Sequence, residues 1–169
     1  MASRREDLGS WLEGTPGGSA ESGRLGLPAT GRGSPAGLLR RLIGVAVDWL
    51  LSLAVSSVLF PADDAGAMGL LAGAPLATLA VFGVSTAVLV ALLGHTIGHR
   101  LVGVGVVRLR DVTGDGDMAG DIAARQRPPG PVAAVVRTVL LCLVIPAAVW
   151  DGDGRGLHDV AAGTVIVRR

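Results

Sequence analysis

Charged side chains inside apolar stretches are the residues of this sequence best suited to chemistry. Asp48 lies two helical turns into the apolar run 38–60, and Arg137 lies near the start of a later run, 132–150. An unpaired carboxylate at that depth of a bilayer costs roughly 2.5–3.5 kcal/mol on insertion scales, so a partner is expected. We predict a contact between Asp48 and Arg137, direct or through water. Such a pair either relays a proton or cation, or fixes the register of two helices.

Arg41 precedes Asp48 by seven residues, which puts both side chains on nearly the same face of a helix. They are separated by about 10 Å along the axis, too far for a comfortable direct pair. The long side chain of Arg41 can instead reach the headgroups. No serine or cysteine stands in a pattern with His and Asp that would make a nucleophile and its base, so we expect no catalytic residue and no enzyme.

Two histidines, His95 and His99, stand four residues apart, a spacing that suits a metal ion if one helix carries both. His158 would then be a third ligand. Gly94 and Gly98 argue against a continuing helix. We therefore expect surface or hydrogen-bonded histidines, with no metal and no cofactor.

The glycine turn 94–98 and the segment 157–164 are expected to meet as a polar platform at the membrane surface. Asp159 would cap a short helix or accept hydrogen bonds from exposed N–H groups of the turn, and Thr164 would do the same. The other turn residues of interest are Gly94, Thr96 and Gly98.

Three apolar runs must position these side chains. The run 38–60 would measure about 35 Å as a helix, enough to cross a bilayer, and 67–93 forms a second span with a kink at Pro75. The third run, 132–150, contains Pro146 and either spans or returns as a re-entrant hairpin. A return is favoured because the strand candidates 101–109 and 163–168 would then share one side and could pair.

The predicted fold is an all-α membrane protein with a small cytoplasmic two-strand element. Residues 1–37 are predicted to be a disordered tail and 38–169 the membrane domain. The chain of 169 residues is 50% hydrophobic, with a net charge of +1, which gives no reason to expect a nucleic-acid partner. Six arginines precede or begin the first span and five follow the second, so the N-terminus and the loop 94–131 are predicted to be cytoplasmic.

Small residues recur every fourth position in the second span, at Gly69, Gly73 and Ala77 and again at Gly83, Ala87 and Ala91. This spacing lets helix backbones approach closely. It fits packing within one chain or a homo-oligomer.

The order of these motifs resembles the RDD family of bacterial integral membrane proteins over residues 38–169. The resemblance is carried by Arg41 and Asp48, by the turn Gly94-His95-Thr96-Ile97-Gly98 with the LVGVGVVRL segment after it, and by the segment 155–164. It implies that Arg41, Asp48 and Asp159 are the arginine and two aspartates that name the family. It further implies the bacterial plasma membrane as location.

Two functions follow as hypotheses. Transport is the role usually suggested for the RDD family, with sodium/proton antiport proposed for some members, so Asp48 would act in a transporter of ions or small solutes. Two or three helices enclose no pathway, so this role needs an oligomer. The alternative is a non-enzymatic scaffold or accessory protein that recruits a cytosolic or membrane partner through its N-terminal tail and an arginine-bearing face.

Overall fold

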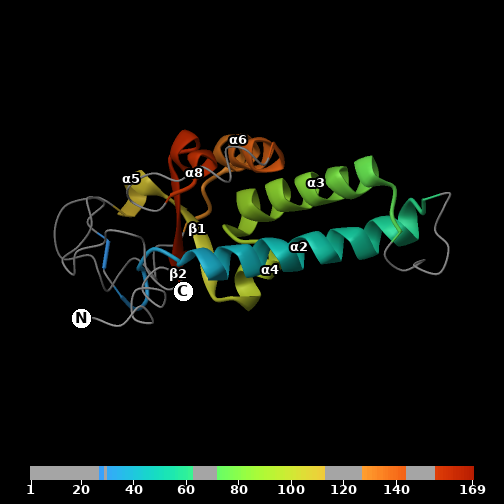
Figure 1. Cartoon of the computed structure of the whole chain (residues 1–169). Coiled ribbons are helices and arrows are strands. Elements are labelled where there is room, and N and C mark those ends of the chain that lie inside the picture. Colours follow the sequence, from blue (N-terminus) through green and yellow to red (C-terminus); the bar gives the residue numbers. More distant parts are fainter. Residues whose placement is uncertain (1–26, 29, 63–71, 113–126, 144–154) are drawn as a thin grey trace, which may run out of the picture.

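The computed structural model describes residues 27–28, 30–62, 72–112, 127–143 and 155–169. Two long helices, α2 (Leu38–Leu59) and α3 (Pro75–Leu93), lie side by side, and the shorter elements gather near the end where α2 begins (Figure 1). Among the described residues, these are the two helices long and apolar enough to cross a membrane.

The ends of α3 explain one wrong prediction. Pro75 is the first residue of the helix rather than a kink inside it, because a proline at that position loses no intrahelical hydrogen bond. The span predicted from residue 67 therefore begins at 75, and residues 67–71 lie outside the described residues. Gly94 ends the helix in the left-handed conformation, with φ at 71°.

Five short elements complete this end of the molecule: α4 (Ile97–Leu101), β1 (Val104–Arg108), α5 (Leu109–Val112), α8 (Leu157–Ala161) and β2 (Thr164–Arg168). The strands pair antiparallel, from Val104 opposite Arg168 to Arg108 opposite Thr164. This confirms the pairing predicted for the segments 101–109 and 163–168. Both strands therefore stand at the same end of the molecule.

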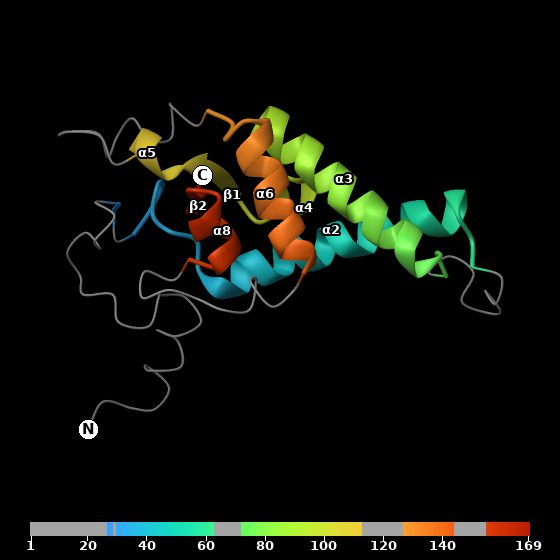
Figure 2. The ribbon, with the colours of Figure 1, turned by 90° about the horizontal axis from the view of Figure 1, so that it is seen from above.

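The third apolar run forms α6 (Pro131–Cys142), which packs across α3 (Figure 2). Its 12 residues measure about 18 Å, well short of a hydrocarbon core of about 30 Å. Residues 144–154, including Pro146, lie outside the described part of the chain. A Cβ on Gly83 would lie 3.6 Å from Sγ of Cys142, so this small residue of α3 packs against α6 within the chain.

The segment before α2 was predicted to be disordered, yet its last residues extend the sheet. The Ala36 N–H donates to the carbonyl of Ile166 over 2.9 Å, and the Arg168 N–H donates to the carbonyl of Ser34 over 2.9 Å. Leu27 and Ala36 are both buried and belong to the apolar core on the two faces of the strands. Residues 1–26 lie outside the described residues.

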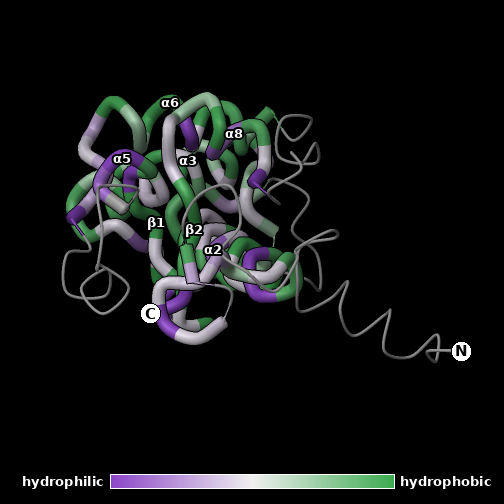
Figure 3. Tube along the Cα trace, turned by 90° about the vertical axis from the view of Figure 1, so that its left-hand side faces the viewer, coloured by the Kyte–Doolittle hydropathy of each residue, from purple (hydrophilic) through white to green (hydrophobic). Residues whose placement is uncertain are grey.

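The long helices bury mostly polar residues and expose mostly apolar ones. The residues that α2 buries are polar or glycine: Arg41, Gly44, Asp48, Ser52, Ser56 and Ser57. None of its leucines and valines is buried, and of those in α3 only Val90 is. Figure 3 colours the chain by hydropathy and shows hydrophobic stretches in the helices near the α3 and α6 labels. A polar seam thus runs between two helices whose outer faces are apolar.

Candidate functional site

Asp159 is the centre of a buried charge cluster. Its carboxylate accepts from Nε of Arg137 over 2.6 Å and from Oγ1 of Thr164 over 3.1 Å. The guanidinium of Arg41 lies 3.9 Å away and the imidazole of His158 lies 3.5 Å away. Asp159 itself is fully buried. Its partners come from α2, α6, α8 and β2, so one carboxylate joins four elements.

Burial alone would raise the pKa of the Asp159 carboxyl. Arg137, His158 and Arg41 oppose this, and together they hold that pKa below its ordinary value. Arg137 and Arg41 are also buried, at 1% and 5% exposure. Nε of Arg41 donates to the carbonyl of Ala36 over 2.8 Å, which fixes the first turn of α2 to the preceding segment. The charged form of the Asp159 carboxyl is therefore favoured, and Arg41 ties the cluster to the backbone before α2.

Asp48 makes a second clamp, between α2 and α4. Its carboxylate accepts from the backbone N–H of Gly98 over 2.7 Å and from the hydroxyl of Thr96. Thr96 also caps α4, because its hydroxyl oxygen accepts from the His99 N–H over 3.1 Å. A Cβ on Gly98 would lie 2.0 Å from the carbonyl oxygen of Gly44, so only glycine allows this approach.

These contacts correct the predicted pairing. Arg137 pairs with Asp159 rather than with Asp48, and Asp48 is held by a hydroxyl and a backbone N–H instead of an arginine. The carboxylate that accepts from the glycine turn is thus Asp48, a role that we had predicted for Asp159. Thr164 binds Asp159, and Gly94 ends α3. Both predicted segments are tied to α2, the glycine turn through Asp48 and the segment 157–164 through Arg41.

His99 is the residue that sequence reasoning placed wrongly. Its side chain is 2% exposed, and neither ring nitrogen has a hydrogen-bond partner within the described residues. Burial, reinforced by Arg137 and then by Arg41 and His95, outweighs the opposing effect of Asp159 and lowers the pKa of His99 to about 3. The imidazole is therefore neutral at physiological pH. Gly98, directly before it, was the available signal, because small residues mark close packing as well as turns.

A cavity of about 190 Å³ opens beside Asp48, between α2 and α3. Besides the carboxylate, its walls carry the hydroxyl residues Ser52, Ser85, Thr86 and Thr96, among apolar neighbours. Carboxylate and hydroxyl oxygens are hard ligands that suit protons and small cations. In the described ranges, no group of three His, Cys, Asp or Glu side chains is placed to hold a metal ion.

No protein-family model, curated protein or solved structure matches this chain. The geometry of the clamp, the cluster and the cavity is therefore the basis for a functional assignment.

Proposed function

We propose that this chain is an RDD-type multi-pass protein of the bacterial plasma membrane that takes part in cation transport, with no catalytic role. The membrane part rests on the exposed apolar faces of the long helices. Leu76, Val84 and Leu92 of α3 are 82%, 65% and 69% exposed. In a soluble protein, an apolar surface this extensive would drive association, whereas lipid tails cover it without cost.

The proposed topology puts the N-terminus and the strand-bearing end in the cytoplasm. The exposed arginines Arg40, Arg100 and Arg110 all belong to this end, as the positive-inside rule requires. The pairing of β1 with β2 supports a third segment that returns to the side from which it entered. Reporters fused after positions 115 and 169 should then report the cytoplasm, and one after position 64 the opposite side. Opposite signals from 115 and 169 would contradict the return.

The cation-binding role rests on one observation: Asp48 borders a cavity that also carries four hydroxyl side chains. The Thr96 hydroxyl and the Gly98 N–H each donate to the Asp48 carboxylate, yet a carboxylate has about four acceptor sites, so capacity for a cation remains. The cavity lies along the helices rather than in the charge cluster. We infer that the cluster holds the helices in place while Asp48 binds the cation.

A pathway across the membrane needs more helices than one chain supplies, so the proposal includes a homo-oligomer. The full chain would be reconstituted in sealed vesicles, and uptake of radioactive Na⁺ driven by a pH gradient would be measured. Asp48→Asn should abolish the uptake. Asp111→Asn removes an acid that is outside the cavity and should leave the Na⁺ uptake unchanged. Equal uptake by the wild type and Asp48→Asn would end the transport proposal.

The second candidate is the scaffold, which Arg40, Arg100 and Arg110 favour because exposed basic residues suit an acidic partner. Deleting residues 1–26 stops short of Leu27, which is part of the core, and should leave membrane insertion intact. Loss of partner recovery with this variant would support the scaffold role, and retained recovery would count against it.

A further inference from the structure

A second recess, separate from the Asp48 cavity, lies at the strand-bearing end of the molecule. It measures about 550 Å³ and is bounded by the junction of β1 with α5, by the first turns of α6 and by the turn from α8 into β2. Two arginines, Arg108 and Arg110, line it, and every other lining residue is apolar or glycine. A cavity that combines guanidinium groups with apolar walls suits an anion carrying an apolar body.

Arg108 is held in place at the start of α6. Its Nε donates to the carbonyl of Pro129. A Cβ on Gly130 would come within 2.8 Å of its Nη2, so the guanidinium packs directly on the glycine backbone. Gly130 also has a φ of 83°, a conformation that favours glycine. The charge of Arg108 is therefore presented from a fixed position.

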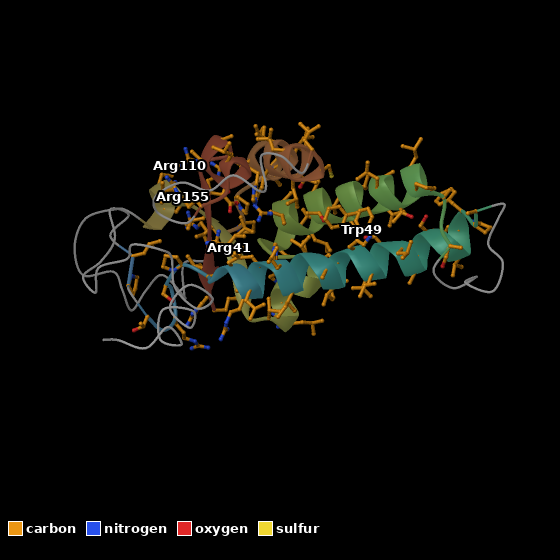
Figure 4. The ribbon with its side chains drawn as sticks, in the orientation of Figure 1. Arg41, Trp49, Arg110 and Arg155 are labelled. Atoms are coloured by element: carbon orange, nitrogen blue, oxygen red, sulfur yellow. The ribbon has the colours of Figure 1, made fainter. Side chains whose placement is uncertain are left out.

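Arg110 is the freer of the two cations. Its side chain is 73% exposed, and its Nε lies 3.7 Å from the carboxylate of Asp111, which is 37% exposed. Exposed pairs of this kind contribute about 0–1 kcal/mol, so Asp111 is a weak competitor for another anion. Arg110 belongs to α5, and Figure 4 shows it at the end of the molecule where α2 begins.

The apolar wall connects the recess to the outer surface of the helices. Val132 and Val136 line it from α6 and are 75% and 38% exposed, and Val135 and Val139 continue the exposed apolar face along the same helix. On the opposite side Ala161, Ala162 and Gly163 leave room because their side chains are small. The recess thus has a basic end toward the polar elements and an apolar end toward the helices.

We propose that this recess binds one anionic phospholipid, with its phosphate at Arg108 and Arg110 and an acyl chain along Val132 and Val136. Guanidinium groups bind phosphate with two parallel hydrogen bonds, and basic pockets at the cytoplasmic surface favour anionic headgroups. A free phosphate would use the arginines but would leave the valine wall without a function. The inference rests on the membrane placement in the proposed function, and it is independent of cation binding at Asp48.

The test titrates the detergent-solubilised full chain with phosphatidylglycerol or with phosphatidylcholine of the same acyl chains. Native mass spectrometry gives the apparent Kd of the first bound lipid. Phosphatidylglycerol should bind several-fold more tightly. Arg110→Gln should weaken it about fivefold, the equivalent of about 1 kcal/mol per basic residue. Ala162→Phe should also weaken it by filling the recess, whereas Arg100→Gln, which removes an exposed arginine elsewhere at this end, should not.

Equal affinity for the two lipids, or equal losses with Arg100→Gln and Arg110→Gln, would overturn the proposal. Binding of inorganic phosphate that is lost in Arg110→Gln, without any preference for phosphatidylglycerol, would assign the recess to a free anion. That result would also overturn the proposal. Asp48→Asn should bind phosphatidylglycerol as the wild type does. Loss of cation uptake in this variant with lipid affinity retained separates the two proposals.

Discussion

Replacing Asp159 with Asn should destabilise the protein more than replacing either of its arginine partners. The substitution removes the carboxylate that faces two buried guanidinium groups, those of Arg41 and Arg137. Breaking a buried pair from one side costs about 3–5 kcal/mol. We expect a loss of about 5 kcal/mol, because two cations lose one partner. A loss of this size is comparable to the entire stability of many domains.

Arg137→Met should cost less, about 3 kcal/mol. In that variant the carboxylate of Asp159 keeps Arg41 at 3.9 Å, His158 at 3.5 Å and the Thr164 hydroxyl at 3.1 Å. The double variant Arg137→Met/Asp159→Asn should be no less stable than Asp159→Asn alone. The two losses would then fall short of additivity by about 3 kcal/mol, a coupling energy at the upper end of the range for residues in contact.

The measurement is SDS-induced unfolding of the detergent-solubilised chain, followed by far-UV circular dichroism. Arg110→Gln removes an exposed ion pair and serves as the control, with an expected change below about 0.5 kcal/mol. Additive losses in the double variant would refute the reasoning. So would recovery of an Arg137→Asp variant by Asp48→Arg, because that result would make Asp48 the true partner of Arg137.

Three further predictions concern the α4 region. His99 has a folded pKa of about 3 against an ordinary value near 6.5, so stability is fully present above pH 6.5 and falls as the pH drops toward 3. Between pH 7 and pH 5 the loss should be about 2 kcal/mol by SDS unfolding, and a His99→Phe variant should lack this slope. Gly98→Ala should prevent folding, because its Cβ would lie 2.0 Å from a carbonyl oxygen; Gly83→Ala, whose Cβ meets only an ordinary 3.6 Å contact, should fold normally in fluorescence-detected size exclusion. Thr96→Val removes the hydroxyl that donates to Asp48 and caps α4, and should cost about 1–3 kcal/mol in thermal unfolding, while Thr96→Ser should restore most of it. A Thr96→Ser variant as unstable as Thr96→Val would show that the methyl group, and not the hydroxyl, matters.

Local hydropathy was sufficient to predict the long helices and the two strands, but not the short helices α4 and α5. Two apolar runs of the predicted kind became α2 and α3, and two short β-branched segments became β1 and β2. Their pairing agrees with the sequence argument, in which a return of the third run was favoured because it would let the two strands pair. Boundaries were less accurate, as the late start of α3 at Pro75 shows, because a proline inside an apolar run is read equally well as a kink or as a first residue.

Sequence alone indicated that Asp48 and Arg137 would be buried, because they stand in segments too apolar to leave them in water. Arg41 was expected to reach the headgroups, yet it is 5% exposed and faces Asp159, whose own burial the sequence did not indicate. Only the tertiary structure decided their partners. Position along a helix gives the depth of a side chain, but the neighbour it meets depends on how helices rotate and on which distant segment fills the space between them. Asp159 reaches Arg137 because α8 packs on α6, and Gly98 reaches Asp48 because Gly44 lets α4 approach α2. The burial of His99 follows from the same close approach of α4 to α2. The hydropathy of its own segment gives no indication of it.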